Sequence, residues 1–133
     1  MDAINSIYII DDDHIFTFIT ERMITSNHYS EKVNVFSNGE DAINQIKYNL
    51  ENDGELPDVI ILDLNMPIMD GWEFLEHFNE LDIQKRITIY IVSSSIDIQD
   101  IERVREYEKV SNYLIKPITA EKLVDLIAGT NLK

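Results

Sequence analysis

Acidic residues follow two of the most apolar runs in this 133-residue chain. Asp11, Asp12 and Asp13 come directly after the run 7–10, and Asp63 comes directly after the run 59–62. Apolar runs of this length are typical of buried strands. If both strands belong to one parallel sheet, their carboxyl ends meet in one crevice, where crowded carboxylates require a cation or shared protons. The pattern therefore predicts a hard metal ion beside one reactive carboxylate.

Two further apolar runs end on polar residues. The run 87–92 leads into Ser93, and the run 113–115 leads into Lys116. After Asp63, the turn-forming residues 67–71 are expected to keep that carboxylate at a strand tip, with the backbone carbonyl of Asn65 free to face the same ion. Carboxylates from two strand ends, a hydroxyl group and an ammonium group are thus predicted at one edge of a sheet.

The elements that must position these groups follow from hydrophobic periodicity. The expected strands are Ile7–Ile10, Val33–Phe36, Val59–Leu62, Ile87–Val92 and Tyr113–Ile115. The expected helices bury, in chain order, Ile15, Ile19 and Met23; Ala42, Ile43, Ile46 and Leu50 (capped by Asn38); Phe74, Leu75, Phe78 and Leu81 (opened by Asp70-Gly71); Ile101 and Val104 (from about Ile98); and Leu123, Leu126 and Ile127 (between Thr119 and a stop at Gly129). Asn49–Pro57 is expected to be a loop. Five strand–helix repeats predict an α/β fold: a doubly wound parallel sheet with helices on both faces.

Composition narrows the class of protein. The length fits a single domain over residues 1–133, and 44% hydrophobic residues can form a core. With 25 acidic against 11 basic residues, the charge of −14 argues against nucleic acid as a partner and favours a basic or amphipathic protein surface. The absence of cysteine excludes disulfides and thiolate metal sites. The sequence contains no signal-peptide pattern and no membrane-span pattern. We therefore expect a cytoplasmic protein that does not associate with a membrane.

Taken together, the acid pair, Asp63, Ser93 and Lys116-Pro117 resemble the receiver domain of bacterial two-component response regulators, of the chemotaxis-regulator type. The resemblance covers nearly the whole chain, with every landmark in order. It implies a flavodoxin-like three-layer sandwich with strand order 2-1-3-4-5, and a stand-alone receiver domain without an output domain.

The resemblance also implies a role for each position. Asp63 would be the phosphoacceptor. The implied ligands of Mg²⁺, for which Mn²⁺ could substitute, are Asp12, Asp63, the backbone carbonyl of Asn65 and, through water, Asp11. Ser93 and Lys116 would contact the phosphoryl group, and Ser93 with Tyr113 would form a switch in which the tyrosine moves from exposed to buried. Ser93 stands where threonine is commoner, so its hydroxyl lacks the methyl group that would restrict its rotamers.

The implied function is phosphorelay signal transduction. A sensor histidine kinase or a histidine phosphotransfer protein would supply the phosphoryl group, and contacts of the fourth helix, fifth strand and fifth helix with a downstream protein would change. Activation could produce a homodimer. The chain would catalyse only its own phosphorylation and autodephosphorylation, and so would not be an enzyme in the usual sense.

Simpler interpretations stay open for the single residues. Asp11 and Asp12 could be helix caps, although Asp13 fits that role best and is left out of the metal set. Ser93 alone could be a turn residue, Lys116 a solvent-exposed side chain, and Tyr113 an edge-strand aromatic. His14, with no second histidine nearby, is expected at the surface.

Two other functions compete. The first is divalent-cation binding without phosphoryl transfer, although the acidic spacing does not match a calcium loop. The second is a hydrolase with an aspartate nucleophile, but Asn65 stands where a general acid would be needed.

Overall fold

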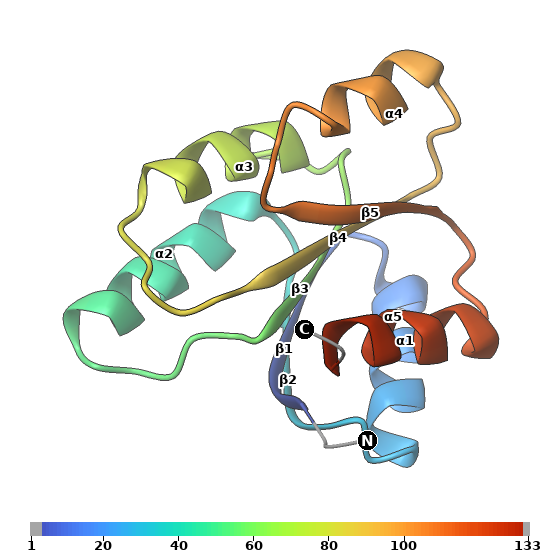
Figure 1. Cartoon of the computed structure of the whole chain (residues 1–133), viewed down its shortest axis with the longest axis horizontal. Helices are drawn as coiled ribbons and strands as arrows, with labels where there is room; N and C mark the ends of the chain where they lie inside the picture. The colour runs from blue at the N-terminus through green and yellow to red at the C-terminus, as the bar shows by residue number, and fades with distance from the viewer. Residues whose placement is uncertain (1–3, 132–133) are drawn as a thin grey trace.

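Residues 4–131, which this computed structural model describes, form five strands that alternate with five helices (Figure 1). The strands are β1 (Ile4–Ile10), β2 (Ser30–Phe36), β3 (Val59–Leu62), β4 (Thr88–Ser93) and β5 (Val110–Ile115). The helices are α1 (His14–Ser26), α2 (Gly39–Glu51), α3 (Gly71–Glu80), α4 (Ile98–Val104) and α5 (Ala120–Asn131). The predicted alternation of strands and helices is confirmed.

All strands pair in parallel, in the order β2-β1-β3-β4-β5. In the centre of the sheet, Ile7 of β1 lies opposite Val33 of β2 on one side and Val59 of β3 on the other. The chain moves outward from β1 to β2 and then crosses back to β3, so the winding direction reverses between β1 and β3. The carboxyl ends of these two strands therefore open the crevice where ligands bind in such sheets.

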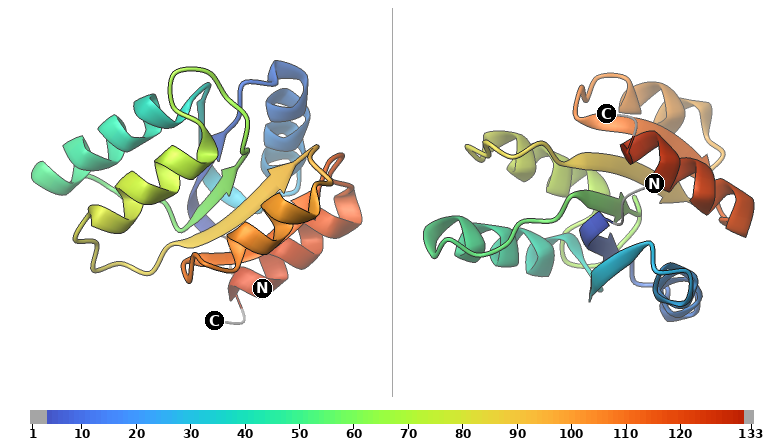
Figure 2. Two further views of the ribbon diagram at one scale, coloured as in Figure 1. Left: turned by 90° about the horizontal axis from the view of Figure 1, so that it is seen from above. Right: turned by 60° about the horizontal axis from the view of Figure 1, so that its bottom comes forward.

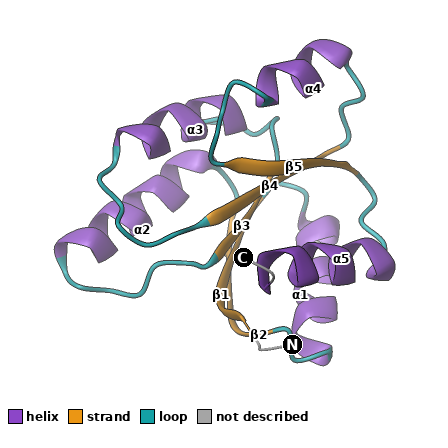
Figure 3. Cartoon of the chain, viewed as in Figure 1, coloured by secondary structure: helices purple, strands orange, loops and turns teal. Residues whose placement is uncertain are grey.

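The sheet separates two hydrophobic cores, because successive side chains of a strand point to opposite faces. Along β1, Ile7 and Ile9 belong to the core beneath α1 and α5, whereas Tyr8 and Ile10 belong to the core beneath α2, α3 and α4. Figure 3 shows the strands between these two sets of helices, and the turned views of Figure 2 show the same layers. The fold is a doubly wound, flavodoxin-like three-layer sandwich, as predicted.

Polar side chains cap the helices at the predicted starts. The side chain of Asn38 accepts a hydrogen bond from the backbone N–H of Asp41 at 2.9 Å and so caps α2. Asp70 and Glu73 form a reciprocal capping box at the start of α3. Thr119 Oγ1 accepts a hydrogen bond from the N–H of Lys122 at 3.1 Å at the start of α5.

The predicted buried face of the first helix is wrong. Ile15 and Ile19 of α1 are 74% and 50% exposed, and of the three predicted residues only Met23 is partly buried against the core. The residues that α1 buries are Phe16, Thr17, Thr20 and Ile24. A spacing of four residues defines a helix face but not which face points inward, and the inward face here is one residue further along. Because two residues of that face are threonines, a hydrophobicity pattern does not identify it.

Several predicted ends also differ. α5 continues past the expected stop at Gly129 to Asn131. A Cβ atom at that glycine would lie 3.4 Å from the hydroxyl of Tyr90, so the residue packs in a helix interior rather than ending it. α2 extends to Glu51, into the segment expected to be a loop, and β1, β2 and β5 each start three residues earlier than expected.

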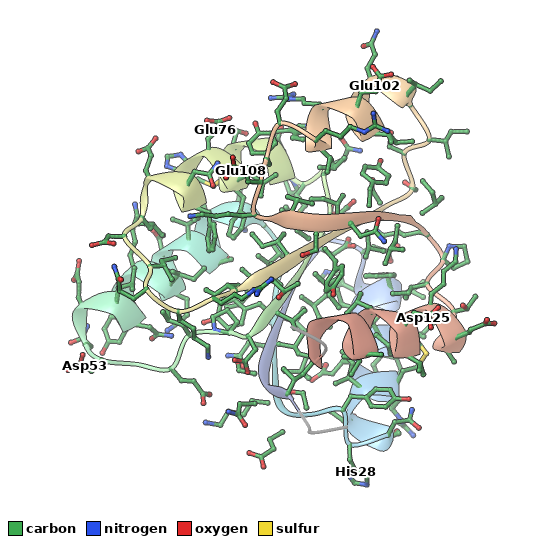
Figure 4. The ribbon with its side chains drawn as sticks, in the orientation of Figure 1. His28, Asp53, Glu76, Glu102, Glu108 and Asp125 are labelled. Atoms are coloured by element: carbon green, nitrogen blue, oxygen red, sulfur yellow. The ribbon has the colours of Figure 1, made fainter. Side chains whose placement is uncertain are left out.

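The acidic side chains spread over the surface instead of gathering on one element. Figure 4 shows Asp53, Glu76, Glu102, Glu108 and Asp125 on different elements, and all five are exposed. Among residues 4–131, no helix combines the length and the apolar character that crossing a membrane requires.

Candidate functional site

Three consecutive acids after β1 have three different environments. Asp13 caps α1, because its Oδ1 accepts hydrogen bonds from the N–H groups of Ile15 and Phe16 at 3.1 and 3.2 Å. Asp11 is 1% exposed, and its Oδ1 accepts a hydrogen bond from the N–H of Asp13 at 2.9 Å. Asp12, between them, has an exposed side chain. The expected capping role of Asp13 is confirmed, and Asp12 is left facing solvent at the mouth of the crevice.

Asp63 lies just after β3, and the chain that follows packs tightly against it. Its Oδ1 accepts a hydrogen bond from the N–H of Leu64 at 2.9 Å. The N–H of Gly71 donates to the carbonyl oxygen of Leu64 at 2.9 Å. A Cβ atom at Gly71 would lie only 2.4 Å from the carbonyl oxygen of Asp63, so no larger residue fits without a backbone shift. This explains why the cap of α3 is followed by glycine.

Lys116 brings a positive charge to the carboxylates. Its Nζ lies 2.8 Å from Oδ2 of Asp11, 3.8 Å from Oδ2 of Asp63 and 4.0 Å from Oδ2 of Asp13. The ammonium group also lies 4.5 Å from the centre of the Phe16 ring. The side chain is only 13% exposed, so the solvent-exposed position considered for this lysine is not what the structure shows.

Oxygen ligands for a cation gather at this place. Within residues 4–131, Asp11, Asp12 and Asp63 each offer a carboxylate oxygen, and these oxygens all lie within 4.8 Å of one another. Carboxylate oxygens are the ligands that Mg²⁺ and similar hard cations prefer. Asn65, whose backbone carbonyl is a predicted ligand, lies in the loop between β3 and α3 with an exposed side chain. The donor set therefore fits a hard divalent cation.

Burial raises the pKa of both inner carboxyl groups. The pKa of Asp11 rises to about 6, because burial disfavours the charged form more strongly than the contact with Lys116 favours it. Burial also raises the pKa of Asp63, while Lys116, the N–H of Leu64 and a hydrogen bond from Ser93 oppose the rise. Each aspartate thus lacks part of the stabilisation that an added cation would supply.

Ser93 and Tyr113 lie at the far side of the crevice. Ser93 is fully buried at the end of β4, and its Oγ accepts a hydrogen bond from the N–H of Ser95 at 3.2 Å. Tyr113 of β5 is partly buried, and its hydroxyl donates to the carbonyl oxygen of Ser95 at 2.9 Å. In this structure the tyrosine is therefore already turned inward, and its predicted movement stays a prediction.

Two residues in this region carried no role in the sequence-based prediction. Phe16 lies beneath the ammonium group of Lys116, and the wrong phase assigned to the first helix had concealed it. Asp100 of α4 accepts a hydrogen bond from Ser95 Oγ at 2.8 Å. The only signal for Asp100 in the sequence is its position in the first turn of a helix that follows a polar strand end.

Comparison with known proteins agrees with this geometry. The sequence model described as the response regulator receiver domain matches residues 7–128. This chain belongs to that family. A two-component response regulator from Cytophaga hutchinsonii, known from its crystal structure, superposes on this receiver domain with a TM-score of 0.86 and 30% sequence identity, covering 99% of this chain and 100% of that one.

Two further proteins are also similar to this receiver domain. The chemotaxis protein CheY of Bacillus subtilis is 26% identical over 124 residues, which cover 93% of this chain and 95% of CheY. A chain of the CheX–CheY–BeF3–Mg²⁺ complex from Borrelia burgdorferi has the same fold, with a TM-score of 0.80 at 22% identity over 97% of this chain and 90% of that one. Three other curated relatives are longer, and this chain covers 17% to 38% of them, so receiver domains also occur within larger proteins.

Proposed function

We propose that this receiver domain accepts a phosphoryl group on Asp63 from the phosphohistidine of a sensor histidine kinase or a histidine phosphotransfer protein. The observation that carries the proposal is the position of Asp63: its Oδ2 lies 3.8 Å from Lys116 Nζ, and it shares a cluster of carboxylate oxygens with Asp11 and Asp12. In the transfer, a carboxylate oxygen of Asp63 forms a bond to phosphorus, and the bond from phosphorus to the donor imidazole nitrogen breaks. The electron pair of the broken bond remains on the imidazole.

The residues of the site divide the work of positioning and charge stabilisation, which is most of what phosphoryl transfer requires. Lys116 is near enough to Asp63 to contact a phosphoryl oxygen there, and lysine suits that contact as a compact point charge. The buried hydroxyl of Ser93, whose interaction with Asp63 lowers the pKa of that carboxyl group, would donate a hydrogen bond to the same phosphoryl group. A bound Mg²⁺ supplies the remaining positive charge and reduces repulsion between the carboxylate and the incoming phosphoryl group.

The hydrogen bonds support different metal roles for the two acids after β1. Both oxygens of Asp11 have close partners, the N–H of Asp13 and the ammonium group of Lys116. Asp12 is exposed and so can turn its carboxylate to the cation directly. We therefore propose Asp12, Asp63 and the backbone carbonyl of Asn65 as direct ligands, with Asp11 acting through water. The Mg²⁺ in the Borrelia burgdorferi complex supports this cation, and Mn²⁺ takes the same oxygen ligands.

The signal would leave the domain through protein contacts. Ser93 ends β4, and Tyr113 connects β5 to the segment before α4 through Ser95. A change at the phosphoryl group is therefore passed to the face formed by α4, β5 and α5. A downstream protein, or a second copy of the domain, would read that face, and catalysis would extend only to the domain's own phosphorylation and autodephosphorylation.

The experiment mixes the protein with Mg²⁺ and a small acyl phosphate and measures intact mass after rapid quenching. One phosphoryl adduct is expected, and it should be lost in Asp63→Asn and on addition of a chelator. Asp53→Asn is the matched control and should form the adduct normally, because Asp53 is exposed in the loop before β3, at the other end of that strand from Asp63. Binding of Mg²⁺ without any adduct would instead favour the alternative function, cation binding without phosphoryl transfer.

A further inference from the structure

Ser93 presents a problem of orientation for the proposed reaction. A serine side chain can take three staggered rotamers, and these direct its hydroxyl to three different places, so a hydroxyl that serves one phosphoacceptor has to be held in one of them. Threonine at this position would be restricted by its methyl group, but serine has none. Something other than the side chain itself must therefore hold the hydroxyl of Ser93 in place.

The segment after β4 supplies a hydrogen bond that can do so. The backbone N–H of Ser95 donates to Ser93 Oγ at 3.2 Å. This bond occupies a lone pair of the Ser93 oxygen, and the single hydroxyl proton is then free to point the other way. Asp63 is the partner in that direction, since an interaction with the Ser93 side chain is among the effects that lower the pKa of Asp63 against burial.

Ser95 is itself held from several sides. Its Oγ donates to Oδ2 of Asp100 at 2.8 Å and accepts a hydrogen bond from the N–H of Asp97 at 3.3 Å. Its carbonyl oxygen accepts a hydrogen bond from the Tyr113 hydroxyl at 2.9 Å. The shortest of these bonds ends on a carboxylate, and hydrogen bonds to charged groups are the stronger kind. Asp100 is therefore the main anchor of the Ser95 side chain.

We propose that Ser95 and Asp100 are positioning residues for phosphoryl acceptance, because together they hold the Ser93 hydroxyl in the rotamer that faces Asp63. The proposal rests on the proposed function. In this domain the pair does the work that the methyl group of threonine would do at position 93.

The size of the effect follows from the number of rotamers. If the anchor is removed and the three rotamers of Ser93 become equally populated, the fraction of molecules with a correctly placed hydroxyl falls about threefold. Asp100→Ala should therefore form the acyl-phosphate adduct up to about threefold more slowly than the wild type. Asp100→Asn keeps an oxygen acceptor for the Ser95 hydroxyl and should retain most of the rate.

Glu102→Ala is the matched control, since it removes an exposed carboxylate from the same helix (Figure 4). It should leave the rate unchanged. The decisive variant is Ser93→Thr, because its methyl group restricts the rotamer without help from the anchor. In the Ser93→Thr background, Asp100→Ala should have no effect on the rate, a result that a general loosening of α4 would not produce.

The outcomes separate this inference from the proposed function. If the wild type forms no adduct, the proposed function is wrong and the positioning role falls with it. If the wild type forms the adduct but Asp100→Ala reacts at the wild-type rate, only the positioning role is wrong. An equal loss of rate with and without the Ser93→Thr substitution would also overturn it, since the anchor would then act by another route.

Discussion

The buried carboxyl group of Asp11 makes a quantitative prediction about the stability of the metal-free protein. Its pKa is raised from the ordinary aspartate value of 3.8 to about 6, chiefly by burial. The ammonium group of Lys116, 2.8 Å away, offsets only part of this effect. A rise of this size corresponds to about 3 kcal/mol of preference for the neutral form in the folded state.

The sign follows from the number of bound protons. Between pH 3.8 and about 6, the folded chain holds a proton on Asp11 that the unfolded chain has released. The free energy of unfolding therefore falls as pH rises through this window. Asp11→Asn removes the titration but keeps the shape of a neutral carboxyl group. The variant should resemble the wild type at the acid end and exceed it by about 3 kcal/mol near neutral pH.

Urea unfolding in the presence of a chelator, repeated from about pH 4 to about pH 7, measures this difference. The control is Asp53→Asn, because Asp53 is exposed and has a φ of 55°, a conformation that asparagine also tolerates. Its difference from the wild type should not change with pH. A gap between the wild type and Asp11→Asn that stays constant or narrows with rising pH would show that burial does not hold a proton on Asp11. Added Mg²⁺ should narrow the gap at neutral pH, because a cation favours the ionised site and stabilises the folded state.

Three further predictions concern packing around the site and in the core. Gly71→Ala should slow adduct formation and lower the free energy of unfolding by about 3 kcal/mol, because its Cβ would lie 2.4 Å from the carbonyl oxygen of Asp63. Gly129→Ala is the control: its Cβ would have its nearest contact at 3.4 Å, so the free energy of unfolding should change little. Phe74→Ala should cost about 3–5 kcal/mol in urea unfolding, since its side chain is fully buried, and a cost below about 1 kcal/mol would show that the core is not packed as described. Arg103→Gln should cost about 0.5–1 kcal/mol and shift the emission of Trp72, the sole tryptophan, to longer wavelength, because the guanidinium group lies 4.2 Å from the ring; unchanged fluorescence would exclude that contact in solution.

The sheet and its crevice could be predicted from sequence because one strong physical signal marks them. Four consecutive apolar residues before Asp63 have to be buried, and a carboxylate that directly follows them has to lie at the end of the buried strand. Parallel strands then bring such ends to the same edge. For this reason Asp11, Asp12, Asp63 and Lys116 lie together, although more than a hundred residues separate the first from the last.

The inward face of α1 could not be predicted in this way. Ile15 and Ile19 have the same spacing of four as Phe16, Thr20 and Ile24, and their side chains are more apolar than those of the threonines. Periodicity alone favours the wrong set. The cap of Asp13 on the N–H groups of Ile15 and Phe16 fixes where the helix begins. Which face then turns inward is decided by packing against the sheet, where Phe16 and Ile24 join the core, and a local pattern does not contain that information.

The charges of the site connect these points to function. The clustered carboxylates of Asp11, Asp12 and Asp63 have one ammonium group beside them, that of Lys116, which also lies 4.0 Å from Asp13. At least two negative charges therefore remain when all are ionised. Burial makes those charges costly, which is why the pKa of Asp11 rises to about 6. A divalent cation would offset this excess of negative charge, and the oxygen ligands for it are already in place. The same excess would repel a phosphoryl group, so we expect the cation to bind before the phosphoryl donor arrives.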